Sequence, residues 1–340
     1  MSKLSFISAA DLAAALASMP EADDAAASLA RARQEQLTKP VGSLGRLEEL
    51  AIWMASWQGQ EKPQLENPAC LVFAGNHGVA ARGVSAYPPE VTFQMVMNFE
   101  AGGAAINQLT NLADATLKVT ALDLDTPTQD FTQTAAMTEA ECCAALQAGA
   151  DAVPDNADMV LVGEMGIGNT TAAAAVCNAV FGGAATDWIG PGTGVDDKGM
   201  AIKKETVTTA IALHGDNQTS AFECLRTVGG RELAAIAGAV IEARHRGIPV
   251  LLDGYISTAA ASALTRDNPA ALDHAIISHV SMEPGHKRLA EKLNQRPVLD
   301  LDLRLGEASG AAIALLIVRA ALATHNGMAT FGEAGVSTAS

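Results

Sequence analysis

The 340-residue sequence is poor in positive charge and has no long apolar run. It contains 22 lysine and arginine residues against 38 aspartate and glutamate residues, a formal net charge of −16. Such an acidic chain argues against binding to nucleic acids or to anionic membranes. A few cations and backbone dipoles can still bind a small anion locally. No apolar stretch approaches the roughly 20 residues of a membrane-spanning helix, so none is expected.

Cysteine is scarce as well, with five scattered residues and no CxxC pair. Neither a disulfide framework nor a metal site is therefore expected. We interpret the cysteines as free thiols, which indicates a protein of the reducing cytoplasm. The N-terminus has an acidic residue, Asp11, inside its apolar stretch and no convincing cleavage site. We interpret it as a helix rather than a signal peptide.

Several nucleotide and hydrolase motifs are also missing. The chain has neither a Walker A sequence nor a GxSxG elbow, which argues against P-loop NTP hydrolysis and against an α/β-hydrolase. A dinucleotide fingerprint is incomplete, because Thr171 stands where the third glycine after Gly166 and Gly168 belongs. A nicotinamide-cofactor dehydrogenase is therefore disfavoured, and no cofactor is expected.

The most informative stretch is MVLVGEMGIGNTTAAAAV, residues 159–176. Its pattern predicts a buried strand, a glycine-rich turn and an alanine-rich helix, and such a helix start offers free N–H groups to an anion. Thr170 or Thr171 can cap the helix, and Glu164 stands at the strand end. A phosphate-bearing substrate is indicated. The alternative is an ordinary capped helix whose glycines serve the turn alone.

Six apolar segments separated by helical stretches predict an α/β fold with a doubly wound, mostly parallel, Rossmann-like sheet. The predicted strands are residues 69–74, 117–122, 159–162, 248–252, 274–277 and 298–302. Polar side chains follow the strand ends, where open α/β sheets bind ligands; they are Asn76, His77, Glu164, Asp253 and His279. Residues 1–35 and 305–340 are left over and could form a small helical domain beside a large domain of residues 36–304.

Other candidates have two readings each. His77 could be an acid or base, or a hydrogen-bonded structural histidine. Lys203 and Lys204 follow a second glycine-rich loop that contains Gly192, and they could meet phosphate or lie on an exposed helix face. Lys39 and Arg46 flank a glycine-serine loop and could contact phosphate or a partner, or simply be solvated.

A loop and helix at residues 83–100 carry Ser85, Tyr87 and Gln94, which would suit a flat aromatic ligand or would pack on the core. Glu164 and Glu307 each follow a glycine at the end of a predicted strand, and such a pair of carboxylates makes a glycosidase one alternative. Transfer at the anomeric carbon of a phosphorylated sugar fits the combination of an anion cradle and a carboxylate better, and it needs no metal if the leaving group departs easily.

Five blocks of this sequence resemble the nicotinate-nucleotide–dimethylbenzimidazole phosphoribosyltransferase family in their order along the chain. They are TKPVGSLGRLE (38–48), FAGNHGV (73–79), GEMGIGNTT (163–171), SHVSMEPGH (278–286) and LGE (305–307). The resemblance implies transfer of phosphoribose from nicotinate mononucleotide to 5,6-dimethylbenzimidazole, within assembly of the lower ligand of cobalamin. It also implies a homodimer with a sheet domain and a small helical domain.

The resemblance assigns roles residue by residue. Glu307 is the expected general base and Glu164 a second active-site glutamate that positions or stabilises charge. The expected aromatic-acceptor pocket consists of Ser85, Tyr87, Gln94 and Met165. The expected nucleotide and phosphate site consists of Gly166, Gly168, Asn169, Thr170, Gly192 and Lys203 or Lys204.

One position departs from the family pattern. Ala308 follows Glu307 where a glycine is expected, and alanine is disfavoured if the backbone there needs a positive φ. Because both glutamates are present, we expect an enzyme; the alternative is a catalytically silent protein that binds nicotinate mononucleotide. Which benzimidazole or other base is preferred does not follow from the sequence.

Overall fold

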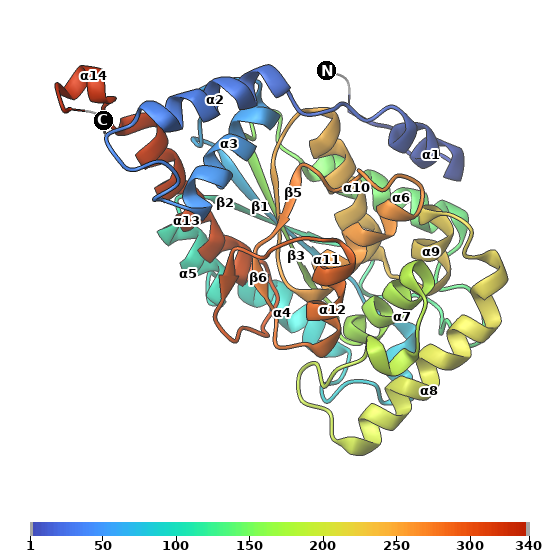
Figure 1. The fold of residues 1–340 in the computed structure, drawn as a ribbon. Coiled ribbons are helices and arrows are strands. Elements are labelled where there is room, and N and C mark those ends of the chain that lie inside the picture. Colours follow the sequence, from blue (N-terminus) through green and yellow to red (C-terminus); the bar gives the residue numbers. More distant parts are fainter. Residues whose placement is uncertain (1–2, 338–340) are drawn as a thin grey trace.

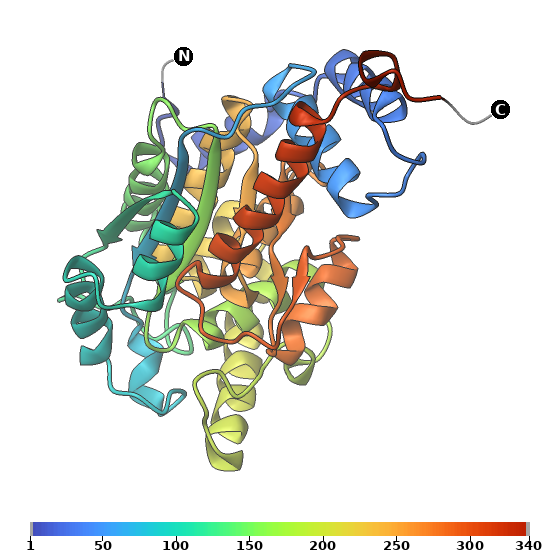
Figure 2. The same ribbon diagram turned by 90° about the vertical axis from the view of Figure 1, so that its left-hand side faces the viewer.

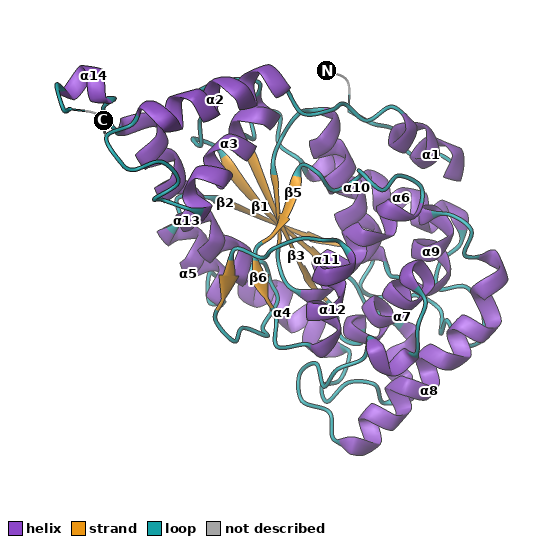
Figure 3. Ribbon diagram, in the orientation of Figure 1, coloured by secondary structure: helices purple, strands orange, loops and turns teal. Residues whose placement is uncertain are grey.

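The computed structural model describes residues 3–337 and is built around a five-stranded parallel sheet (Figure 3). The strand order is β2-β1-β3-β4-β5. Every residue of β1 is buried, and so are six of the seven residues of β3. Such apolar runs are typical of parallel strands covered on both faces. The strands are β1 (Pro68–Ala74), β2 (Thr116–Ala121), β3 (Met159–Met165), β4 (Val250–Leu252) and β5 (Ala275–Ile277).

The predicted α/β class is confirmed, but the count of six strands in one sheet is wrong. The sixth segment forms β7 (Leu299–Asp300), which pairs with β6 (His279–Val280) in a separate two-stranded sheet. The side chain of Gln295 explains the difference. It accepts the Ile277 N–H (3.0 Å) and donates to the Ala275 carbonyl (2.9 Å), so it occupies edge groups of β5 that a sixth strand would need.

Helices cover both faces of the sheet (Figures 1 and 2). One face carries α6 (Glu139–Ala152), α7 (Asn169–Phe181), α10 (Arg231–His245) and α11 (Tyr255–Ser262). The other face carries α3 (Arg46–Gln58), α4 (Glu90–Glu100), α5 (Ala105–Leu112) and α13 (Ser309–Gly327). This two-faced cover is the doubly wound arrangement that the sequence predicted.

Helix α13 has the length and composition of a membrane span, with a mean hydropathy of 1.3. It nevertheless lies along the sheet (Figure 2) and contacts β3, β4, α3 and α5. Most of its buried apolar residues belong to the same apolar cluster as Val72 and Leu161 of the central strands. Its apolar character is accounted for by this core position.

The remaining helices lie around this core. Helix α2 packs on α3, α3 packs on α13, and α1 contacts α9 (Figure 1). The α-helices outside the two layers that cover the sheet are α1 (Ala9–Ala17), α2 (Asp24–Gln36), α8 (Asp197–His214), α9 (Ala221–Val228), α12 (Pro284–Lys292) and α14 (Phe331–Ala334). The division into a helical domain from both chain ends and a sheet domain stays a prediction.

Candidate active site

The glycine-rich turn lies where β3 passes into α7. Glu164 is 5% exposed, and its carboxylate accepts a hydrogen bond from the Asn169 side-chain amide. The N-cap of α7 is Gly168, whose φ of 97° lies in the left-handed region that favours glycine. The predicted threonine cap is therefore wrong: Thr170 lies beyond the cap, and Thr171 is buried with its hydroxyl unpaired in the described structure.

A cavity opens at the carboxyl end of the sheet between this turn and later segments of the chain. Glu164 and Met165 form one wall, and Arg304, Leu305 and Gly306 form another. The remaining lining residues are Gly166, Ile167, Asn169, Thr170, Gly192, Thr193, Gly254, Tyr255, Ile256, His279, Ser281 and Glu283. The cavity thus combines the glycine-rich turn with groups from four further segments, as expected for this edge of an α/β sheet.

Glu307 directly follows Gly306, which lines this cavity, and is not itself a lining residue. It is 6% exposed, and burial raises the pKa of its carboxyl to about 7, with a further contribution from the charge of Asp253. The neighbouring Gly306 lies against the Glu164 carboxylate, because a Cβ on Gly306 would fall 2.5 Å from Glu164 Oε1. Burial, then Asp253, Glu232 and Glu307, raise the pKa of Glu164 well above its usual range. The two predicted glutamates are therefore neighbours with raised pKa values.

The backbone between Glu307 and α13 is left-handed, with φ of 62° at Glu307 and 65° at Ala308. The structure thus places Ala308 in the conformation for which a glycine was expected. A non-glycine residue in this region costs roughly 1–2 kcal/mol. Ala308 is fully buried and belongs to the apolar cluster around α13.

Lys203, rather than Lys204, contacts the glycine-rich turn. Its ammonium donates to the Thr170 hydroxyl (2.9 Å) and to the Gly190 carbonyl (2.8 Å). The residue is 1% exposed, and burial lowers the pKa of its side chain to about 8. Lys204 is exposed on the next position of α8. A cation beside Thr170 and the N-terminus of α7 is suited to an anion.

Sequence reasoning gave no role to Glu283, which also lines the cavity. Its Oε1 accepts the Gly192 N–H at 2.7 Å, while its buried Oε2 has no hydrogen-bond partner among the described residues. Burial raises the pKa of Glu283, opposed by the nearby Lys203. The SHVSMEPGH block was the available signal, but a carboxylate beside a glycine loop was not anticipated from it.

Comparisons with known proteins agree with this geometry. A family model described as phosphoribosyltransferase matches residues 19–336. The chain belongs to this phosphoribosyltransferase family. A curated relative from Ruegeria sp. (strain TM1040), named nicotinate-nucleotide–dimethylbenzimidazole phosphoribosyltransferase, is 56% identical over 96% of this chain and 97% of its own length. A relative of the same name from Novosphingobium aromaticivorans is 56% identical over 98% of both chains.

Solved structures of this phosphoribosyltransferase family have the same fold. The crystal structure of the nicotinate-nucleotide–dimethylbenzimidazole phosphoribosyltransferase from Thermus thermophilus superposes with a TM-score of 0.86 at 41% identity. The match covers 93% of this chain and all of that structure. A second structure from the same organism gives a TM-score of 0.87 at 42% identity.

The residues expected to bind the aromatic acceptor do not all meet at the cavity within one described chain. Met165 lines it, whereas Tyr87 is 52% exposed and Gln94 lies exposed on α4. Ser85 lines a separate shallow depression. Helix α4 is nevertheless tied to the glycine-rich turn, because the Ile167 N–H donates to the Thr92 hydroxyl at 3.1 Å. The acceptor assignment therefore stays a prediction.

His77 lies beneath the turn rather than in the cavity. It is 2% exposed, and its Nε2 hydrogen-bonds the Glu232 carboxylate, which is fully buried. Glu232 in turn lies close to Gly75 and Gly166, since a Cβ on either would approach its carboxylate. Of the two readings of His77, this placement favours the structural one.

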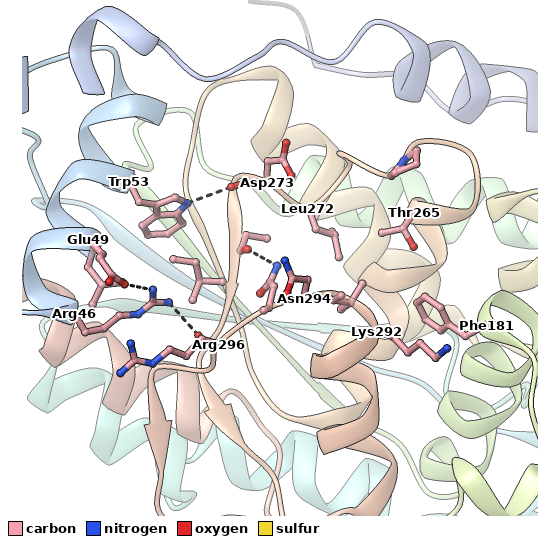
Figure 4. A pocket seen from close by; sticks show the side chains of 16 residues that line it. Arg46, Glu49, Trp53, Phe181, Thr265, Leu272, Asp273, Lys292, Asn294 and Arg296 are labelled. Atoms are coloured by element: carbon pink, nitrogen blue, oxygen red, sulfur yellow. Dashed lines mark hydrogen bonds and ion pairs between the residues drawn. The ribbon is translucent and has the colours of Figure 1, made fainter. Parts of the chain in front are cut away.

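A larger cavity of about 690 Å³ lies beside β5, and of the candidate residues from the sequence it contains only Arg46 among the described residues that line it (Figure 4). Arg46 there bonds Glu49 (2.6 Å) and the Arg296 carbonyl (3.0 Å), as the dashed lines in Figure 4 mark. Lys39 is paired with Glu48 at 2.7 Å. These contacts place Lys39 and Arg46 in local ion pairs away from the glycine-rich turn.

Proposed function

We propose that this protein transfers phosphoribose from nicotinate mononucleotide to 5,6-dimethylbenzimidazole, producing α-ribazole 5′-phosphate and nicotinate for the lower ligand of cobalamin. Curated relatives with the name of this enzyme are 53–58% identical to the chain and support the reaction. The observation that carries the proposal is that Glu307 is a close neighbour of Glu164 beside the glycine-rich turn, with the intervening Gly306 lying against the Glu164 carboxylate.

In the proposed mechanism, Glu307 accepts the N–H proton of the benzimidazole. The lone pair of the other ring nitrogen of the benzimidazole forms the new bond to C1′ of the donor ribose. The bond from C1′ to the pyridinium nitrogen breaks, and its electron pair returns to nicotinate. The donor ring is already cationic, so it leaves without acid help, and attack from the opposite face inverts C1′. A positioned base with a pKa near 7 typically contributes about 10²–10⁴-fold in rate.

Glu164 faces the positive charge of the donor and of the transition state. Its hydrogen bond from Asn169 fixes the carboxylate at the end of β3. Burial raises the pKa of Glu164. A bound cationic pyridinium or a developing oxocarbenium ion would favour the ionised form, because an opposite charge stabilises a carboxylate. We therefore assign Glu164 to charge stabilisation and positioning rather than to proton removal.

The donor phosphate is assigned to Lys203, Thr170 and the N–H groups of Gly166 and Gly168, with Asn169 at the start of α7 and Gly192 on the facing loop. The Asn169 N–H itself donates to the Gly166 carbonyl (3.1 Å). The direct contact between Lys203 and Thr170 supports this arrangement. The proposal also keeps the homodimer and the cytoplasmic location that the sequence suggested. All five cysteines are buried free thiols, which is consistent with a reducing compartment.

Chromatography of products tests the proposal directly. Purified protein is incubated with nicotinate mononucleotide and 5,6-dimethylbenzimidazole without added metal, beside Glu307→Gln. Wild type should release nicotinate and α-ribazole phosphate, and the variant should be slower by about 10²–10⁴-fold. Binding of the nucleotide without any turnover by wild type would identify a silent binding protein. Undiminished turnover by Glu307→Gln would keep the reaction and remove Glu307 as its base.

A further inference from the structure

Asp253 connects three elements of the site although it does not line the cavity. It directly follows β4 and is 1% exposed. Its Oδ1 accepts the Ala311 N–H at 3.0 Å, in the first turn of α13. Its own N–H donates to the Val162 carbonyl of β3 at 3.3 Å. The Ser278 hydroxyl donates to its carbonyl at 3.1 Å. The residue is thus fixed by β3 and by the segment after β5 while its carboxylate caps α13.

The first turn of α13 determines where Glu307 stands. The Ser309 N–H donates to the Gly306 carbonyl (3.0 Å) and the Ala312 N–H to the Ala308 carbonyl (2.9 Å). These bonds close the helix start around the left-handed pair Glu307 and Ala308. A carboxylate that binds a free N–H group of this turn therefore stabilises the strained conformation of the base.

Asp253 also places a negative charge near Glu307, in addition to that of the neighbouring Glu164. The charged and titratable groups around the base are Glu164 from β3, Asp253 after β4, His279 from β6, and Arg304 on its own segment, with Glu232 of α10 behind Glu164. His279 faces Asp253 with its Nδ1 at 3.7 Å from Oδ1. Burial raises the pKa of Asp253, while His279 and the backbone N–H groups of Ala311, Gly254 and Gly310 oppose this.

We propose that Asp253 is a positioning residue for Glu307. Its carboxylate caps α13, holds the base in its left-handed turn and places a negative charge near the base. The inference rests on the proposed function, in which Glu307 removes the benzimidazole proton. Burial and then the charge of Asp253 raise the pKa of Glu307, because a like charge disfavours the ionised carboxylate, and the base becomes stronger. The same charge makes no direct contact with a bound donor, because Asp253 does not line the cavity.

Two neutral variants that can still cap a helix, Asp253→Asn and Asp253→Ser, separate charge from structure. Asp23, which caps α2 through the Ala26 N–H (2.8 Å), provides the matched control Asp23→Asn. The pH dependence of kcat/KM is measured for wild type and the three variants with nicotinate mononucleotide and 5,6-dimethylbenzimidazole. Thermal unfolding and nucleotide binding of each variant are measured alongside.

We expect the acid limb of the profile to move to lower pH by about 1 unit in the neutral Asp253 variants. Its plateau should fall by less than the roughly 10²-fold or more expected when the base itself is lost. Asp23→Asn should keep the wild-type limb. An acid limb that does not move in a folded Asp253 variant overturns the proposal, whatever the plateau. If Asp253→Asn does not fold, Asp253→Ser gives the decision. Failure of the proposed function is separate, since wild type would then give no product.

Discussion

Gly163 lies directly against Ala308, so the residue before one glutamate of the site touches the residue after the other. A Cβ on Gly163 would fall 2.6 Å from the Ala308 Cβ and 2.8 Å from its Cα. Non-bonded carbon atoms do not approach this closely, so β3 and the start of α13 can meet only because Gly163 has no side chain. This contact fixes the position of Glu307 relative to Glu164.

We therefore expect Gly163→Ala to displace the Glu307 turn and to lower kcat by about 10²-fold, because small misplacement of a catalytic group is that costly. Overpacking should also destabilise the fold by about 1–3 kcal/mol. Gly327→Ala is the matched control, since nothing lies within 4 Å of a Cβ there. Steady-state kinetics and urea unfolding measure both effects. Wild-type kcat in Gly163→Ala would mean that the turn adapts without moving the base.

Glu307 should make the protein less stable as pH rises. Its pKa is raised from 4.5 to about 7 in the folded protein, so the folded state binds the proton more tightly than the unfolded state. The stabilisation from this proton is complete below pH 4.5 and is lost as pH rises through 7. Glu307→Gln, which stays neutral, should match wild type near pH 4.5 and be more stable at about pH 8. Urea unfolding at both pH values checks the sign, and a wild type more stable than the variant at the higher pH would contradict it.

Much of the fold was predictable because its information is local. Apolar runs bounded by glycine and polar residues predicted the five strands of the main sheet. Glu164 and Glu307 drew attention because each follows a glycine at the end of a segment, and the family resemblance assigned their roles. The separate pairing of β7 was not predictable in this way. It depends on the Gln295 side chain, which reaches the edge of β5 from 18 residues away.

Contacts in the site between residues that are far apart in the chain were not predictable from the sequence either, because they leave no local pattern. Asp253 caps α13 through Ala311, 58 residues further along the chain, and no local pattern indicates such a contact. The choice between Lys203 and Lys204 could have been made from the sequence, because helical periodicity indicates which of the two lies on the buried face of the helix. Lys203 shares the buried face of α8 with Gly199, Thr206, Val207 and Ala210, and residues spaced by three or four positions lie on one face.

Lys203→Met should raise KM for nicotinate mononucleotide by roughly 10–100-fold, since a hydrogen bond to a charged group contributes about 1.5–3 kcal/mol. Lys204→Met is the matched control and should leave KM near that of wild type, because that side chain is exposed. Wild-type KM should also rise above a pH of about 8, as Lys203 loses its charge. Equal KM values for the two variants would remove Lys203 from the phosphate site.

His77→Leu tests whether the histidine beneath the glycine-rich turn is structural. The substitution leaves the fully buried Glu232 carboxylate without its imidazole partner. Breaking a buried pair in this way costs about 3–5 kcal/mol. We expect unfolding at lower urea concentration, with kcat per folded molecule within about tenfold of wild type. Glu307→Gln should show the opposite pattern, with activity lost and stability kept.

Removing both partners distinguishes the two readings further. In His77→Leu combined with Glu232→Leu, no buried charge is left unpaired, so part of the lost stability should return. An acid or base acting in the reaction would behave otherwise: its removal would abolish turnover in the single and the double variant alike. Because His77 bonds Glu232 beneath the glycine-rich turn and does not line the cavity, we expect the recovery of stability to be accompanied by measurable product formation.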